Sequence, residues 1–106
     1  SKVIYMKSEQ RKQLHIAAVF SANFSNHMFL IAENILNNSD IRFSILLPLI
    51  QQTIKKLEKN KAKDIQTGPA KRNDTSIIKD HLSNIKDKDI REIYHKISEN
   101  IIKEHE

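Results

Sequence analysis

The sequence predicts an all-α fold organised around one long central helix. Residues that form turns are scarce, since the 106 residues include one Gly and two Pro, and this favours a few long helices over many short strands. The many Ile residues would suit strands, but they recur at helical spacing, which is the stronger signal. Residues 15–36 are apolar on two opposite arcs, a pattern typical of a helix that is buried on both sides.

The long helix is expected to cover residues 9–36, with Ser8 as its N-cap and Glu9 in its first turn. At about 100° per residue, its apolar side chains form two arcs. The first arc contains Ala17, Phe20, Phe24, Met28, Ile31 and Ile35, and the second contains Ala18, Ala22, Phe29 and Leu36. A chain this small cannot cover both arcs, which predicts a homodimer or a further domain.

Residues 3–6 (VIYM) resemble a short strand, and a strand needs neighbours with which to pair. We interpret residues 1–7 as either a frayed tail or a remnant of the last strand of a missing domain. Residues 8–106 then form one helical domain.

Three further helices are expected after the long one. The first covers residues 41–60 and contains Pro48, which predicts a kink or break near Leu47. Residues 64–74 hold the only Gly and one Pro, so they are expected to form a loop. A short helix over residues 76–85 follows, capped by Asp74 or Thr75. Asp87 caps a final helix over residues 88–104, whose apolar stripe is Ile90, Ile93, Tyr94, Ile97 and Ile101.

The composition excludes several classes of protein. The chain has no Cys, which removes disulfides, a thiolate nucleophile and Cys-based zinc sites. Its five His residues include no pair at i, i+4 and no HExxH motif, so no metal site is expected. His81 could serve as an exposed phosphotransfer residue, although a lone His on a helix is usually a surface residue. The apolar runs are too short for a signal peptide or a membrane span, so a cytoplasmic protein is expected.

The formal net charge of +5 comes mostly from Lys and Arg interleaved with Asp and Glu. The densest basic segment, residues 55–63, also contains Glu58 and is typical of a solvated helix end. The few aromatic residues lie mostly at core spacing, so no platform for stacking bases is visible. We therefore do not expect nucleic-acid binding, although a basic helical nucleic-acid-binding domain remains an alternative.

A polar strip along the long helix is the first candidate site. It carries His15, Asn26 and Glu33, with Asn23 a little to one side. Polar groups are costly to bury without partners, which indicates that the strip lines a groove toward a ligand or a partner. Alternatively, Asn23 and Asn26 bond neighbouring backbone inside a satisfied core.

The loop over residues 67–74 is the second candidate. Gly68 permits close approach of a ligand to the backbone, and Arg72 offers a planar fork for carboxylate or phosphate. Alternatively, this is a tight turn between helices, in which Arg72 and Asp74 only pair with each other or cap a helix.

Five short motifs occur in an order that resembles the C-terminal half of a family of Rossmann-type oxidoreductases. They are HxAAVFxxNF at 15–24, LLPL at 46–49, TGPxxRxD at 67–74, HL at 81–82 and IY at 93–94. The family is mostly uncharacterised and is related to the pyrroline-5-carboxylate reductases and, more distantly, to 6-phosphogluconate dehydrogenase. One Gly cannot build the GxGxxG turn of the family's dinucleotide-binding domain, so that domain is expected to be missing here.

The resemblance implies a helical bundle like the C-terminal domain of 6-phosphogluconate dehydrogenase. Such a domain dimerises and binds a small-molecule substrate, here unknown, for an NAD(P)-dependent oxidoreductase. NAD(P) would bind the complete enzyme and not this chain alone, which would be inactive. The alternative is a helical interaction module without a catalytic role.

The resemblance also implies site residues. His15 could relay a proton and Asn23 could donate to a substrate carbonyl or carboxylate, as catalytic residues. Arg72 could anchor an anion. The substrate-binding candidates are Asn26, Thr67, Gly68, Arg72 and Asp74.

Overall fold

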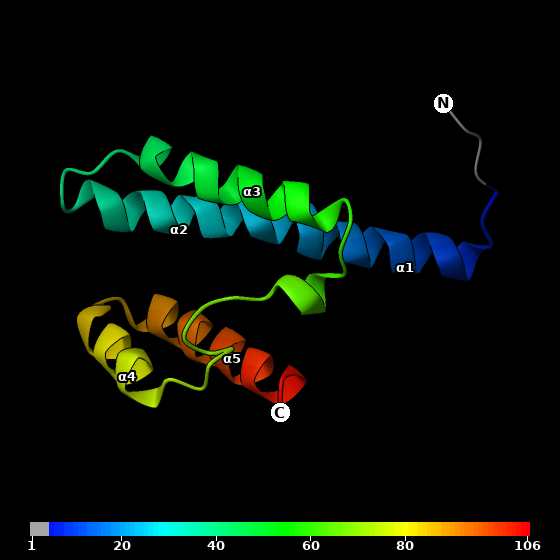
Figure 1. The fold of residues 1–106 in the computed structure, drawn as a ribbon. Coiled ribbons are helices and arrows are strands. Elements are labelled where there is room, and N and C mark those ends of the chain that lie inside the picture. The colour runs from blue at the N-terminus through cyan, green and yellow to red at the C-terminus, as the bar shows by residue number, and fades with distance from the viewer. Residues whose placement is uncertain (1–4) are drawn as a thin grey trace. The chain divides into compact units, whose positions relative to one another are not determined.

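A computed structural model describes residues 5–106, and within them every regular element is a helix (Figure 1). The predicted all-α fold is therefore confirmed. The expected strand over residues 3–6 falls partly outside the described residues, and Tyr5 and Met6, which are described, have no regular structure. The chain divides into two compact units, Ser1–Leu47 and Pro48–Glu106.

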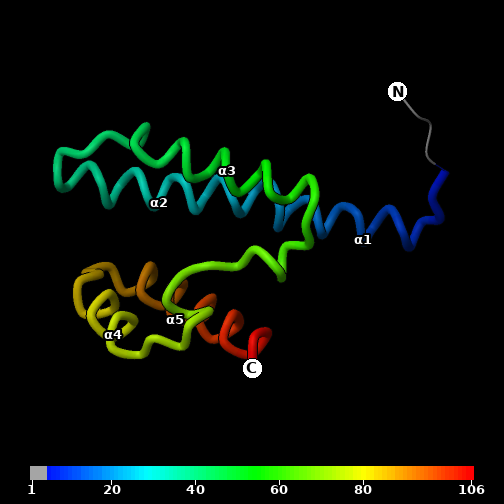
Figure 2. The backbone as a smooth tube through the Cα atoms, viewed as in Figure 1, coloured from blue at the N-terminus to red at the C-terminus, as the bar shows by residue number. Residues whose placement is uncertain are grey.

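The first unit is dominated by one continuous helix. It consists of α1 (Ser8–Ala18), the π-helical segment η1 (Val19–Phe24) and α2 (Ser25–Asn37). Figure 2 shows this rod running from the blue α1 to the cyan α2 without a break. The long helix expected over residues 9–36 is confirmed, and the π segment in its middle is a feature that uniform helical periodicity did not predict.

The helix begins one residue earlier than expected. Lys7, not Ser8, is the N-cap residue, and its backbone N–H donates to the side chain of Gln10 at 3.0 Å. A Gln at the third helical position that reaches back to the cap is one half of a capping box. The Ser8 hydroxyl accepts instead from the Arg11 guanidinium at 3.2 Å.

The chain reverses direction after the long helix, through residues 38–42. The N–H groups of Ser39 and Ile41 both donate to the carbonyl of Leu36 at 3.0 Å, and Asp40 takes a positive φ of 54°, which Asp tolerates better than most residues. The short 3-10 helix η2 (Phe43–Leu46) follows. Its Phe43 ring lies 6.2 Å from the Phe29 ring, so η2 covers part of α2.

Burial corrects one expectation about the long helix. None of its residues is buried within the chain, although one of the two apolar arcs was expected to pack in the chain's own core. Phe29 and Leu36 of the second arc are half-buried. In the first arc, Phe20 is 65% exposed and Ile35 is 52% exposed, so these two side chains have little cover from the chain itself.

The second unit contains three α-helices, α3 (Leu47–Leu57), α4 (Thr75–Asn84) and α5 (Lys88–Glu104), and the 3-10 helix η3 (Ala62–Ile65). A helix was expected over residues 41–60 with a kink or break near Leu47, and at that point the 3-10 helix η2, which ends at Leu46, passes directly into α3, which begins at Leu47. Pro48 therefore lies in the first turn of α3, where the N–H that it lacks is not needed.

Two aspartates fix where α4 and α5 begin, as predicted. The Asp74 carboxylate accepts from the N–H of Ile77 at 3.3 Å. The Asp87 carboxylate accepts from the N–H groups of Asp89 at 2.8 Å and Ile90 at 3.1 Å. Each bond satisfies a donor that would otherwise be unpaired at a helix N-terminus.

The loop before α4 contains a buried residue and a glycine with an unusual backbone conformation. Among residues 5–106, only Ala70, 6% exposed, and Ile78, 8% exposed, are buried hydrophobic residues, and one lies in this loop and the other on α4. Gly68 has a φ of +102°, a conformation that L-residues rarely adopt, and no heavy atom lies within 4 Å of the position that a Cβ would take.

α4 and α5 lie side by side and are joined by a hydrogen bond (Figures 1 and 2). Nδ1 of His81 lies 2.7 Å from the hydroxyl of Tyr94, and the two rings meet edge to face with centroids 5.8 Å apart. Burial raises the pKa of Tyr94 above its ordinary value of 10.0. The neutral phenol is therefore the form that the folded chain favours.

We predict that Tyr94→Phe lowers the free energy of unfolding by about 1 kcal/mol, because it removes this hydrogen bond. Because the pKa of Tyr94 is raised in the folded chain, the stability of the wild-type protein should fall as the pH rises above 10.0 and the phenol ionises. Tyr94→Phe has no phenol to ionise, so its stability should fall less steeply in that alkaline range. Urea unfolding followed by circular dichroism at neutral and alkaline pH measures both effects. Identical stability and pH dependence in the two proteins would contradict the prediction.

We predict that Gly68→Ala destabilises the second unit by about 1–2 kcal/mol, because a side chain disfavours the positive φ. Since the space around the new Cβ is open, the effect comes from the backbone and not from a steric clash. Lys79→Ala, at an exposed position of α4, is the control and should change stability by less than about 0.5 kcal/mol. Equal unfolding midpoints for the two variants would show that the loop conformation carries no strain.

Candidate functional site

The three candidate residues of the long helix have side chains without a partner among residues 5–106. His15 lies on α1, Asn23 on η1 and Asn26 on α2, and all three are exposed. Among residues 5–106, none of these side chains makes a hydrogen bond or an ion pair, and the side-chain bond that η1 does form joins the Ser21 hydroxyl to the carbonyl of Ala18 at 3.5 Å. The alternative in which Asn23 and Asn26 bond backbone inside a satisfied core is therefore wrong.

The π segment changes which of these residues share a face. A π-helix bonds i to i+5, so η1 accommodates about one more residue than an α-helix would and rotates all that follows by about 100°. His15 and Asn26, about 20° apart in a uniform helix, are then about 80° apart. The single strip expected to hold His15, Asn26 and Glu33 is thus wrong, whereas Asn26 and Glu33, both on α2, still share a face.

The loop over residues 67–74 is shaped by backbone hydrogen bonds. The N–H of Arg72 donates to the carbonyl of Gly68 at 3.4 Å, and the N–H of Asp74 donates to the carbonyl of Pro69 at 2.9 Å. The N–H of Asn73, whose φ is +53°, donates to the carbonyl of the buried Ala70 at 3.0 Å. The loop is therefore a tight turn, as one of the two interpretations expected.

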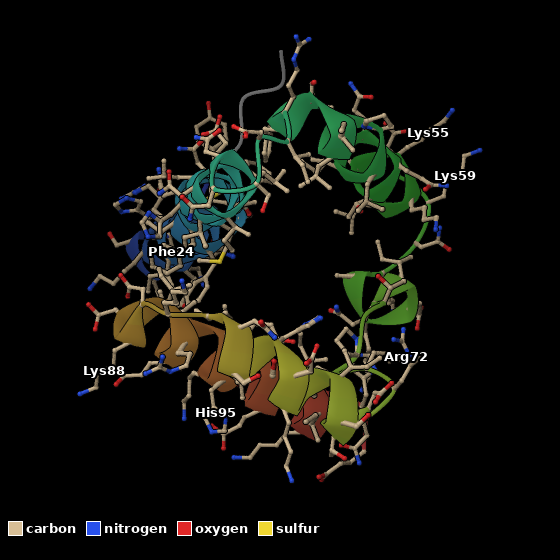
Figure 3. The ribbon with its side chains drawn as sticks, turned by 90° about the vertical axis from the view of Figure 1, so that its left-hand side faces the viewer. Phe24, Lys55, Lys59, Arg72, Lys88 and His95 are labelled. Carbon is tan, nitrogen blue, oxygen red and sulfur yellow. The ribbon has the colours of Figure 1, made fainter. Side chains whose placement is uncertain are left out.

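Among the candidate residues of this loop, Asp74 has a structural role, whereas the side chains of Thr67 and Arg72 are free within the described residues. The Asp74 carboxylate caps α4 and also accepts from the Ser76 hydroxyl at 3.4 Å, so it does not pair with Arg72. The side chains of Thr67 and Arg72 are exposed and have no partner among the described residues. Figure 3 shows Arg72 extending outward from the chain. A free guanidinium beside a tight turn can bind a carboxylate or a phosphate.

The structure thus brings Thr67, Gly68, Arg72 and Asp74 into one loop of the second unit, and it places His15, Asn23 and Asn26 along one helix of the first unit.

Sequence reasoning missed one pairing. His81 was weighed as an exposed phosphotransfer residue, but its Nδ1 is engaged by the Tyr94 hydroxyl. The signal for this was the place of Tyr94 in the apolar stripe of α5, where the hydroxyl of a partly buried Tyr needs a partner. His81 therefore ties α4 to α5.

Other kinds of site have little support in the described part of the chain. Residues 5–106 contain no group of three His, Asp or Glu side chains placed to hold a metal ion. None of the helices there has both the length and the apolar character that crossing a membrane requires. Lys55 and Lys59 extend outward from the region of α3 (Figure 3), as expected for a solvated helix end.

One solved structure similar to this chain comes from Bacteroides fragilis and is described as a "putative NADP oxidoreductase". It aligns with a TM-score of 0.92 and 39% sequence identity. The alignment covers 97% of this chain but 40% of that one, so this chain spans less than half the length of its relative. No curated protein sequence matches the chain.

The sequence profile of one family matches residues 1–101, which is nearly the whole chain. The family is described as a domain of unknown function, DUF2520. Together with the structural match, this shows that the chain is related to part of a protein described as a "putative NADP oxidoreductase" and shares the all-α fold of that part. The chain belongs to the DUF2520 family.

Proposed function

We propose that this chain is the C-terminal substrate-binding and dimerisation domain of an NADP-dependent oxidoreductase. The supporting observation is the asymmetry of the structural match, which covers 97% of this chain and 40% of the Bacteroides fragilis protein. The other part of such an enzyme would bind the dinucleotide. Because hydride transfer needs the nicotinamide, this chain alone would be inactive. A relationship to pyrroline-5-carboxylate reductase and 6-phosphogluconate dehydrogenase is part of the same proposal.

The two groups of free polar side chains take different roles in this proposal. His15 relays a proton and Asn23 donates a hydrogen bond to a substrate carbonyl or carboxylate. Arg72 anchors an anionic group of the substrate, since its guanidinium is exposed and unpaired within the described residues. Thr67 and Gly68 offer a hydroxyl and an open backbone beside Arg72, and Asn26 is a further substrate-binding candidate on the long helix. Asp74 acts indirectly, because its carboxylate is committed to capping α4.

We predict that Asn23→Ala and Arg72→Ala each lower kcat/KM of the complete enzyme for NADPH-dependent reduction by about 10–100-fold. This corresponds to losing a hydrogen bond to a charged group, about 1.5–3 kcal/mol. The loss for Arg72→Ala should lie mainly in KM, because an anchoring contact binds substrate and transition state alike. Stopped-flow oxidation of NADPH against a panel of carbonyl and imine substrates measures both constants.

Lys71→Ala is the matched control, since it removes a neighbouring exposed cation and should leave both constants unchanged. Unchanged turnover in folded Asn23→Ala and Arg72→Ala would contradict the proposed site. That result would favour the alternative, a helical interaction module, which the exposed apolar flank of the long helix also fits.

The dimerisation role is supported by the uncovered flank of the long helix. Phe24 is 47% exposed and Ile35 is 52% exposed. Because eleven residues of helix separate them, the two side chains lie within about 20° of each other around the helix axis. The Phe20 ring, 65% exposed, meets the Phe24 ring edge to face with centroids 4.9 Å apart. A contiguous apolar face of this kind is typical of a surface that another protein surface covers.

We predict that the chain sediments at twice its mass of 12.4 kDa, because a second copy covers this flank. Ile35→Glu should shift the equilibrium toward monomer, since it places a charge within the apolar face. Leu30→Glu is the comparison, because Leu30 is similarly exposed but lies about 140° away around α2. Analytical ultracentrifugation over a concentration series decides the matter, and a wild-type chain that stays at 12.4 kDa throughout would contradict the dimer.

A further inference from the structure

The π segment η1 contains neither of the two residues that most strongly disturb a helix. Val19–Phe24 has no Pro and no Gly, and its one side-chain bond to the backbone joins the Ser21 hydroxyl to the carbonyl of Ala18. The chain has one Gly and two Pro, and all three lie beyond residue 47. π-helical turns are rare and are often found at functional sites. The turn changes the relative directions of the residues on either side of it.

The turn brings Asn23 into line with His15. In a uniform α-helix, Asn23 would lie eight residues from His15 and about 80° away from it around the axis. With about one residue absorbed by the wider turn, the separation is equivalent to seven residues, and the two side chains lie within about 20–30° of each other. The same rotation moves Asn26 off the line. In a uniform helix His15 would share a face with Asn26, whereas with the π turn it shares a face with Asn23.

We propose that η1 is a positioning element, which sets the Asn23 amide on the same face of the long helix as the His15 imidazole. This inference rests on the proposed function for its catalytic meaning, and it assigns Asn23, not Asn26, as the partner of His15. The two side chains stand about two turns apart, or about 10–11 Å along the axis. They therefore contact different ends of one small molecule, with the amide binding a carbonyl or carboxylate and the imidazole acting near the other end.

The chain itself allows a structural test, because it has no Cys of its own. We compare the double variants His15→Cys with Asn23→Cys, His15→Cys with Ala22→Cys, and His15→Cys with Asn26→Cys. Each reacts, at high dilution, with a rigid thiol crosslinker whose reach matches two helical turns, about 10–11 Å. Mass spectrometry of the monomer band counts only links within one chain, and circular dichroism confirms that each variant is helical.

The pair at positions 15 and 23 should crosslink several-fold faster than the other two pairs. Ala22 would align with His15 only if the helix were uniform, so faster linking of the pair at 15 and 22 would overturn the proposal. Equal rates for positions 22 and 23 would overturn it too, since the turn would then fix no face.

The functional test moves the amide by one position in the complete enzyme. Asn23→Ala should lower kcat, and the double variant Ala22→Asn with Asn23→Ala should not restore it, because residue 22 faces about 100° away. Restoration of kcat by the double variant at unchanged stability would overturn the assignment of the face.

The two tests keep the proposals apart. If the complete protein oxidises no NADPH with any substrate, then the proposed function fails, while the crosslinking rates still decide whether η1 aligns residues 15 and 23.

Discussion

The constraint on which this molecule depends is the incomplete cover of its long helix. The rod from Ser8 to Asn37 carries an apolar side chain at nearly every turn, yet none of its residues is buried by the chain's own packing. Apolar surface contributes about 25 cal/mol for each Å² removed from water, so a rod of this kind gains most of its stability from what covers it. The contact between Phe29 and Phe43 covers one flank in part. The flank of Phe20, Phe24 and Ile35 requires another surface.

The second unit is organised differently, with a small core and well-defined helix ends. Ala70 and Ile78 are its buried apolar residues within the described chain, and around them Asp74, Asp87 and the bond between His81 and Tyr94 fix where the helices begin and how two of them meet. The turn that begins at Gly68 is thereby held by backbone and capping bonds alone. Both of its cationic side chains, Lys71 and Arg72, are exposed, and the Arg72 guanidinium has no partner among the described residues.

Rules that depend on a few neighbouring residues predicted much of the fold. Expectations that depend on several helical turns, or on two helices at once, were less successful. The two capping aspartates and the loop at Gly68 each depend on a few neighbouring residues, and all were predicted correctly. The polar strip was wrong because a periodicity argument assumes 3.6 residues per turn throughout, and the turn at Val19–Phe24 does not obey it. The burial of one apolar arc in the chain's own core was also wrong, because periodicity shows which side chains are apolar on one face and not whether the same chain covers that face. The pairing of His81 with Tyr94 joins two helices, and although the apolar surroundings of Tyr94 indicate that its hydroxyl needs a partner, no local rule identifies that partner as His81.

We interpret the long helix as a surface that other protein completes. Hydrogen exchange of its backbone amides can be compared between this chain and a longer protein in which the chain is joined to a dinucleotide-binding domain loaded with NADPH. We expect amides of residues 8–24 to exchange more slowly in the longer protein, while those of α4 and α5, which are held within their own unit, change little. Equal exchange along the long helix in the two samples would refute this interpretation.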